Sequence, residues 1–112
     1  DVKIVAVEPS ADDKYLTGIH NFTDVPAERV PVNIREKIYD EVFVAEKDGA
    51  FAAAQEVAKT DGVLVGISSG AALWGALQIA SRPEYEGKEI VVVLPDTGLR
   101  YLSTDLFKAQ KL

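Results

Sequence analysis

Cysteine is absent from this 112-residue sequence. Its absence excludes disulfide bonds, thiolate nucleophiles and cysteine-ligated metal sites. The sequence also lacks a run of about 18 apolar residues and a charged-then-apolar leader, the patterns typical of membrane insertion and of export. We therefore expect a protein of the cytoplasm that has no membrane partner.

Positive charge and histidine are both scarce. Lys and Arg number 12 against 18 Asp and Glu, which gives a formal net charge of −6. Binding to nucleic acid requires basic side chains gathered on one face to neutralise phosphates, so nucleic acid is not an expected partner. The single histidine, His20, has no second ligand at metal-binding spacing, and we predict no metal site.

Apolar residues are plentiful, at 47% of the chain, which is enough for the core of one domain. Near-continuous β-branched runs predict four strands of a parallel sheet, covered on both faces, at residues 2–8, 41–45, 63–65 and 90–94. Helices are expected at about 48–60 and 69–80. This alternation predicts an α/β fold, an open parallel sheet with flanking helices. A buried strand that begins at residue two also leads us to expect a further part of the protein upstream.

Residues 9–40 differ from the rest of the chain. They hold Pro26, Pro31 and several charges, and they show little periodicity apart from a short helical possibility near Lys14. Long loops in compact domains are commonly functional. We therefore expect this segment to be a functional loop or a lid.

One turn looks most like a site: residues 66–70, Gly-Ile-Ser-Ser-Gly, where an apolar run passes into a helix. The first amides of a helix lack partners within it, and the helix dipole adds positive charge there, so such a turn can hold a polar ligand group. The residues alone leave a second interpretation open, that Ser68 or Ser69 simply caps the following helix.

Four segments together resemble a known family. They read Val-Ala-Val-Glu-Pro at 5–9, Gly-Ile-Ser-Ser-Gly-Ala-Ala at 66–72, Val-Val-Val-Leu-Pro-Asp-Thr-Gly at 91–98 and Arg-Tyr-Leu-Ser-Thr at 100–104. In this order and spacing they resemble the C-terminal part of cysteine synthase, also called O-acetylserine sulfhydrylase. The similarity runs across nearly the whole chain.

That resemblance implies a fold type II enzyme dependent on pyridoxal 5′-phosphate. Residues 1–112 would then be its last third, a portion of the cofactor-binding large domain. The family's Schiff-base lysine, substrate-carboxylate loop and phosphate-binding glycine cup all precede this part, so an upstream N-terminal portion is an implied partner. The resemblance further implies a small amino-acid substrate, a homodimer, and an active-site mouth formed by residues 9–40.

The resemblance also assigns roles to the turn residues. Ser68 matches the serine whose hydroxyl bonds the pyridine nitrogen of the cofactor. A neutral hydroxyl leaves the ring a weaker electron sink than a carboxylate would, which favours β-elimination through an α-aminoacrylate intermediate. Gly66 lies in the same turn, while Pro95 and Asp96 belong to the turn that the resemblance puts beside the ring. By composition alone, that second turn could equally be an ordinary Asp-initiated one.

The departure with most consequence is at Asp24. Cysteine synthases carry a segment His-Lys-Ile-Gln-Gly-Ile-Gly-Ala-Gly-Phe-x-Pro-x-Asn, which aligns without a gap to residues 20–33, and all three glycines are replaced here. Asp24 stands at the first of them, while Glu28 and Arg29 replace the third glycine and the phenylalanine. A carboxylate at residue 24 could act as a general base on water and would repel hydrosulfide. The other interpretation is that Asp24 points into solvent.

Four functions stay open. The favoured one is release of hydrogen sulfide from L-cysteine followed by addition of water to give serine. Cysteine synthesis from O-acetylserine and sulfide comes second, and a replacement that forms cystathionine or lanthionine comes third. The fourth is a non-catalytic piece that only assembles with its missing part. Because the mouth segment is altered, serine acetyltransferase, which inserts its C-terminal tail there in the family, is not an expected partner.

Overall fold

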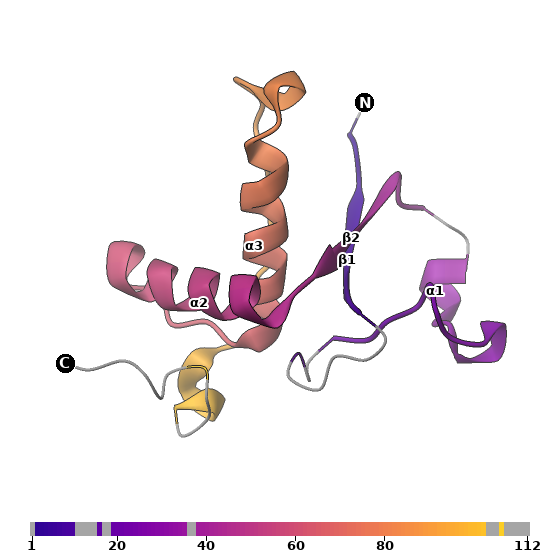
Figure 1. The fold of residues 1–112 in the computed structure, drawn as a ribbon, viewed down its shortest axis with the longest axis horizontal. Coiled ribbons are helices and arrows are strands. Elements are labelled where there is room, and N and C mark those ends of the chain that lie inside the picture. Colours follow the sequence, from indigo (N-terminus) through magenta and orange to yellow (C-terminus); the bar gives the residue numbers. More distant parts are fainter. Residues whose placement is uncertain (1, 11–15, 17–18, 36–37, 103–105, 107–112) are drawn as a thin grey trace.

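The computed structural model describes residues 2–10, 16, 19–35, 38–102 and 106. In chain order the elements are β1 (Val5–Pro9), the 3-10 turn η1 (Ala27–Arg29), α1 (Val32–Arg35), β2 (Glu41–Ala45), α2 (Lys47–Asp61), α3 (Ile67–Ala80), and the 3-10 turns η2 (Pro83–Tyr85) and η3 (Gly98–Tyr101). The molecule is flat, with extents of 45 × 37 × 18 Å. Figure 1 shows α2 and α3 running across each other, with the strand pair on the far side of α3 from most of α2.

The two strands pair in parallel. Val5 lies opposite Glu41, and Pro9 lies opposite Ala45. β2 has the predicted bounds, whereas β1 begins at Val5 rather than at residue two and continues through Pro9. Because the strands are parallel, their carboxyl ends meet at one edge of the sheet, which is where open α/β sheets present ligand-binding residues.

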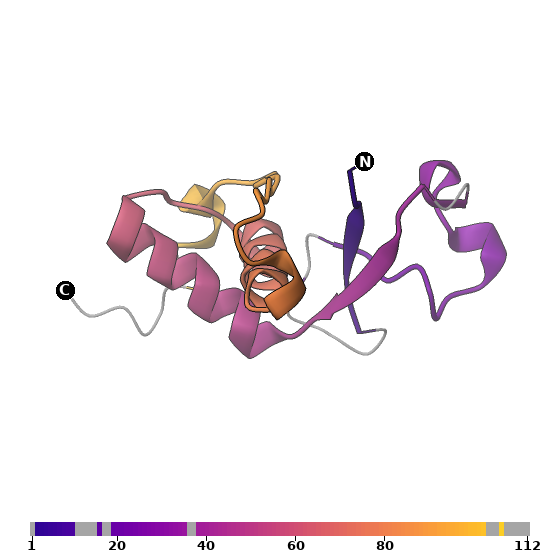
Figure 2. The ribbon, with the colours of Figure 1, turned by 90° about the horizontal axis from the view of Figure 1, so that it is seen from above.

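Small residues let α3 approach the strands closely. A Cβ at Gly75 would lie 3.2 Å from the Phe43 ring and 3.3 Å from a Val7 methyl carbon, and these two residues are opposite each other in the strand pair. Trp74 adds an edge-to-face contact with Phe43, with ring centroids 5.4 Å apart. Seen from above, α3 therefore lies between α2 and the strands (Figure 2).

α2 ends at one glycine and meets α3 at another. α2 stops at Gly62, whose left-handed backbone (φ 66°) accommodates the turn and whose N–H donates to the carbonyl of Val57. The helix thus has nearly the predicted bounds of about 48–60. Where α2 meets α3, a Cβ at Gly70 would overlap the carbonyl oxygen of Ala50, so the two backbones approach as closely as glycine allows.

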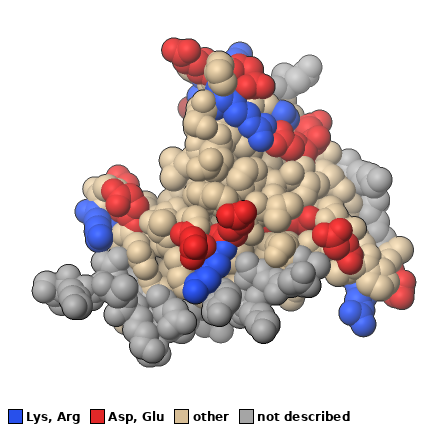
Figure 3. All heavy atoms as spheres, in the orientation of Figure 1, with Lys and Arg blue, Asp and Glu red and all other residues tan. Residues whose placement is uncertain are grey.

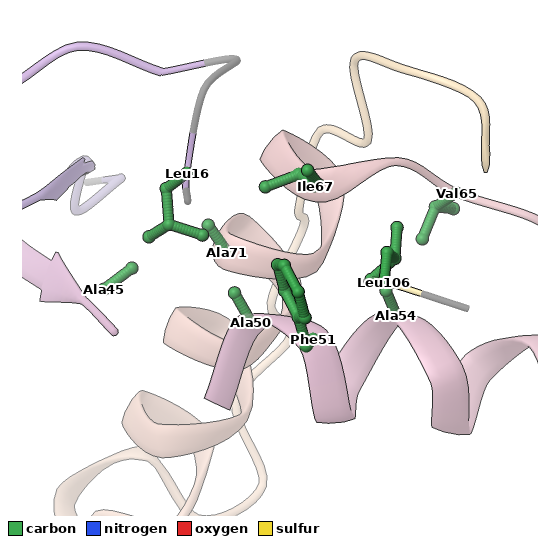
Figure 4. Packing of buried hydrophobic residues seen from close by; sticks show 9 residues of the cluster. All are labelled: Leu16, Ala45, Ala50, Phe51, Ala54, Val65, Ile67, Ala71 and Leu106. Atoms are coloured by element: carbon green, nitrogen blue, oxygen red, sulfur yellow. The ribbon is translucent and has the colours of Figure 1, made fainter. Parts of the chain in front are cut away.

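The hydrophobic core lies where α2 meets the first turns of α3 (Figure 4). Its buried members are Leu16, Ala45, Ala50, Phe51, Ala54, Val65, Ile67, Ala71 and Leu106. Leu16 reaches this cluster from the long connection between β1 and β2, beside Ala71 (Figure 4). That contact holds part of the connection against the beginning of α3.

Two of the predicted strands are not formed. Val65 makes only an isolated antiparallel bridge with Thr97, and residues 90–94 join no ladder within the described chain. Val91 and Val93 are 87% and 75% exposed, the opposite of burial on both faces. An apolar run becomes a strand only where a neighbour supplies the ladder hydrogen bonds, and of the described residues only β1 and β2 supply them to each other. The α/β class with a parallel sheet stands, with fewer strands than predicted.

Residues 9–40 are partly regular. Pro9 is the last residue of β1, and η1 and α1 interrupt what the sequence predicts as loop. The predicted helical turn near Lys14 lies outside the described residues. In the described part of this connection, the regular structure consists of η1 and α1, each a single short turn.

Charged side chains of both signs are interspersed among uncharged ones on the face shown in Figure 3. No charge of one sign gathers over a large part of this face. Among the described residues, no helix has both the length and the apolar character needed to cross a membrane.

Candidate active site

The turn singled out in the sequence begins α3 two residues earlier than predicted. Gly66 is the N-cap residue, with extended backbone, and the helix starts at Ile67. Ser68 and Ser69 therefore stand in the first helical turn, so neither serine is the N-cap. The serine N-cap interpretation is wrong because Gly66 already takes the cap position and a different side chain serves the free amides.

That side chain is Asp96. Its Oδ1 accepts from the backbone N–H of Ser69 at 3.0 Å and from the Ser69 hydroxyl at 2.5 Å, and its Oδ2 accepts from the N–H of Ser68 at 3.4 Å. The Asp96 N–H donates back to Ser69 Oγ at 3.1 Å. A carboxylate at this point satisfies free helix amides and complements the positive end of the helix dipole.

The backbone also joins the two turns. The N–H of Gly66 donates to the Asp96 carbonyl at 3.2 Å, and the N–H of Gly98 donates to the Leu64 carbonyl at 3.2 Å. The structure thus brings together Gly66, Ser68 and Asp96, which the sequence predicts as cofactor-binding. Pro95 precedes Asp96 in the same turn and is exposed.

Ser68 differs from Ser69 in what its hydroxyl does. Ser69 is fully buried and its hydroxyl bonds Asp96, whereas Ser68 is 5% exposed and its Oγ makes no hydrogen bond to any residue that the structure describes. A nearly buried hydroxyl with unused hydrogen-bonding capacity, at a helix N-terminus, fits a polar atom of a ligand.

Asp24 lies on a separate loop at the carboxyl end of β1. Its side chain is exposed, and its backbone N–H donates to Asn21 Oδ1 at 2.9 Å. The Asn21 amide in turn donates to the carbonyl of Pro9 at 2.9 Å, which ties the loop to the end of the strand. Among the described residues, no hydrogen bond or ion pair joins the Asp24 carboxylate to Ser68 or Asp96 or uses that carboxylate at all.

A residue that the sequence analysis passed over holds this loop. Glu8, near the end of β1, is fully buried, and its carboxylate accepts hydrogen bonds from Phe22 and Thr23. The sequence feature that points to Glu8 is an acidic residue at the end of a continuous apolar strand. Such a residue has to find donors when it is buried.

An open hollow of about 780 Å³ lies beside this loop. It is lined by Phe22, Thr23, Ala27, Glu28, Val30, Ile34 and Tyr39. Phe22 and Tyr39 pack edge to face with their centroids 5.6 Å apart. The single histidine, His20, is exposed, and no group of three or more metal-ligating side chains gathers in the described ranges.

The strongest electrostatic shifts lie at the opposite, amino end of the strands. Arg82 bonds Glu41 through two guanidinium nitrogens at 2.9 and 2.7 Å, and Lys3 lies 3.1 Å from the same carboxylate. The Arg82 guanidinium, followed by Lys3, lowers the pKa of Glu41 from 4.5 to about 2. The Tyr85 hydroxyl, followed by Glu41, raises the pKa of Lys3. This cluster stabilises the sheet and takes no part in the candidate site.

Comparison with known proteins identifies relatives. The family described as pyridoxal-phosphate dependent enzymes matches residues 1–96. A cysteine synthase of Buchnera aphidicola subsp. Acyrthosiphon pisum is 38% identical over 92% of this chain and 36% of its own length. A crystal structure of cysteine synthase from Entamoeba histolytica superposes with a TM-score of 0.77 at 38% identity, over 99% of this chain and 34% of that one.

A third relative carries a different activity in its name. It is a substituted form of a hydrogen sulfide-producing enzyme, crystallised in complex with an α-aminoacrylate intermediate. It superposes with a TM-score of 0.66 at 33% identity, over 99% of this chain and 34% of that chain. The present chain thus spans about a third of the length of each of these proteins.

Proposed function

Because this chain belongs to the family of pyridoxal-phosphate dependent enzymes, we propose that it supplies the C-terminal third of an enzyme acting on the β-carbon of a small amino acid. The reaction proposed is release of hydrogen sulfide from L-cysteine with addition of water, so that cysteine and water give serine and hydrogen sulfide. The observation that carries the water-adding reaction is Asp24. It is exposed on a loop held at the carboxyl end of β1, and its carboxylate makes no hydrogen bond or ion pair to any residue that the structure describes.

The cofactor proposal is supported by Ser68. Its Oγ makes no hydrogen bond to any described residue, so it can donate to or accept from the ring nitrogen of pyridoxal 5′-phosphate. The residue is 5% exposed, so bulk water competes little for that bond. When bound, the cofactor withdraws electrons from the substrate and so permits loss of the β-substituent. Asp96 keeps the Ser68 amide in place, and we propose that Gly66 and Pro95 flank the same ring.

Asp24 is proposed as the general base. As a water oxygen bonds to the substrate's β-carbon, the Asp24 carboxylate takes one of the water protons, which avoids forming hydroxide or hydronium. The same negative charge disfavours the approach of hydrosulfide, the nucleophile needed for cysteine synthesis. Both effects direct the reaction towards serine.

A second candidate is cysteine synthesis from O-acetylserine and sulfide. It is favoured by the likeness to two cysteine synthases, each at 38% identity. In this case the Asp24 carboxylate faces away from the substrate. Replacements that form cystathionine or lanthionine, and a non-catalytic assembling piece, are the remaining alternatives.

The proposed partners are the rest of the enzyme and a second copy, in the cytoplasm. The exposed apolar segment 90–94 supports the first of these, because Val91 and Val93 are 87% and 75% exposed and the relatives are about three times as long. An upstream portion could cover this segment and supply the Schiff-base lysine. A purified sample without an absorbance band near the visible edge would contradict cofactor binding.

The test supplies L-cysteine alone to the holoenzyme that contains this chain. Serine and sulfide are expected in equal amounts, and D24N, which keeps the shape of the side chain but removes the base, is expected to reduce serine formation by roughly 10²-fold or more. E84Q is the control, because it removes an exposed carboxylate in η2, outside residues 9–40, and should leave the rate unchanged. Undiminished serine formation by D24N overturns the proposal, and faster formation of cysteine from O-acetylserine and sulfide favours the second candidate.

A further inference from the structure

The carboxylate of Glu8 is buried deeply for an acidic side chain. It is 0% exposed, and among the described residues no cation lies within ion-pair distance of it. A buried carboxylate without hydrogen bonds costs several kcal/mol, so its partners determine whether it is tolerated. Each of its partners named here belongs to the loop that carries Asp24.

Two consecutive loop residues occupy both carboxylate oxygens. Oε2 accepts from the backbone N–H of Phe22 at 2.8 Å and of Thr23 at 3.2 Å, and Oε1 accepts from the Thr23 hydroxyl. Hydrogen bonds to an ionised acceptor are stronger and shorter than neutral ones, so these bonds restrain the backbone immediately before Asp24. The next backbone N–H, that of Asp24, is held by Asn21.

We propose that Glu8 is a positioning residue, which fixes the Asp24 carboxylate for its reaction through Phe22 and Thr23. This inference rests on the proposed function, in which Asp24 is the base. A base has to stand within hydrogen-bond reach of the proton that it removes, and displacement by about 1 Å can cost 10²-fold in rate. An exposed side chain on an irregular loop has few restraints of its own. Glu8 supplies them from a rigid strand.

The hydrogen bonds made by Glu8 explain why residue 8 is an acid. A glutamine at residue 8 keeps one carbonyl oxygen for the two backbone N–H groups, and its NH₂ can only donate to the Thr23 hydroxyl, so every bond loses the negative charge that strengthens it. E8Q therefore weakens the restraint while it preserves side-chain volume. T23V removes the hydroxyl from the loop side at an exposed residue, where a change in shape is tolerated.

The experiment is a double-mutant cycle in the holoenzyme with L-cysteine as substrate. E8Q and T23V are each expected to lower kcat for serine formation about tenfold with KM little changed, because they misplace the base without touching substrate binding. In a D24N background, the same substitutions are expected to cost nothing further. E41Q is the control, since it removes a carboxylate at the other end of the strands and should leave kcat unchanged in both backgrounds.

The outcomes separate the two proposals. If D24N forms serine at the full rate, the proposed function fails, and the role of Glu8 fails with it. A second outcome is that D24N is slow, but E8Q and T23V lower the rate of serine formation by the same factor in D24N as in the wild type. Glu8 then merely stabilises the fold, and the positioning role alone is overturned. The same holds if T23V and E8Q are without effect while D24N is slow.

Discussion

Ser69 and Asp96 bind each other through both side chain and backbone. The Ser69 hydroxyl and amide donate to Asp96 Oδ1 at 2.5 and 3.0 Å, and the Asp96 amide donates to Ser69 Oγ at 3.1 Å. The first turn of α3 is thereby locked to the turn that follows residues 90–94. Ser68 lies on that locked turn, and its own hydroxyl makes no hydrogen bond within the described part of the chain.

The two adjacent serines are therefore expected to respond differently to removal of the hydroxyl. S68A should leave the free energy of unfolding nearly unchanged and should lower kcat of the holoenzyme about two- to tenfold, the equivalent of one neutral hydrogen bond. The absorption spectrum of the bound cofactor should also shift, because the environment of its ring nitrogen changes. Steady-state kinetics and absorption spectroscopy provide the measurements.

S69A is the matched control for that substitution. It removes bonds that tie Asp96 to the helix, so it should lower the free energy of unfolding by about 0.5–2 kcal/mol, as loss of a helix cap does. The cofactor spectrum of the folded fraction should stay the same. A spectral change in S69A with none in S68A would mean that Ser69, and not Ser68, contacts the cofactor.

The sequence predicted those parts of the fold that depend on local pattern. The bounds of β2, the approximate bounds of α2 and the α/β class follow from periodicity and from turn residues, which act over a few neighbours. Residues 90–94 show the limit of this approach, because their apolar pattern cannot say whether a neighbouring strand is available. Whether a run forms a strand depends on residues far away in the sequence.

The candidate site was predictable to a similar extent. The turn at residues 66–70 and its approach to Asp96 were expected from motif and resemblance, but the exchange of bonds with Ser69 depends on a contact across 27 positions of sequence. Glu8 was missed because burial is a tertiary property, and a single acid at the end of a strand looks like a solvent-facing one. Its role emerges only from the donors that surround it.

Close approach of α2 and α3 depends on Gly70. An added methyl group would overlap the carbonyl oxygen of Ala50 and lie 3.0 Å from the Cβ of Ala54, and a backbone carbonyl in a helix cannot move aside cheaply. We expect G70A to lower the free energy of unfolding by about 1–3 kcal/mol, despite the higher helix propensity of alanine. Urea unfolding measures this change. A more stable G70A protein would mean that the helices are further apart than described.

Acid should weaken the cluster around Glu41 at the amino end of the strands. Its folded-state pKa is about 2 against 4.5 for the unperturbed group, so between these values the unfolded chain binds more protons than the folded one. The stabilisation by Arg82 and Lys3 is therefore fully present above pH 4.5 and is lost as the pH falls towards 2.

Thermal unfolding of the wild type and of E41Q at a series of pH values tests this expectation. The wild type should be the more stable protein at pH 7, by a small margin because the Glu41 side chain is 24% exposed and solvent screens the pair. The two proteins should converge as the pH falls from 4.5 towards 2, where Glu41 is protonated. At pH 7, R82K should be less stable than the wild type by part of the difference between the wild type and E41Q, since lysine keeps the charge but cannot form the paired bonds. A difference between wild type and E41Q that persists unchanged at the acid end would show that the side chain contributes through packing rather than through its charge.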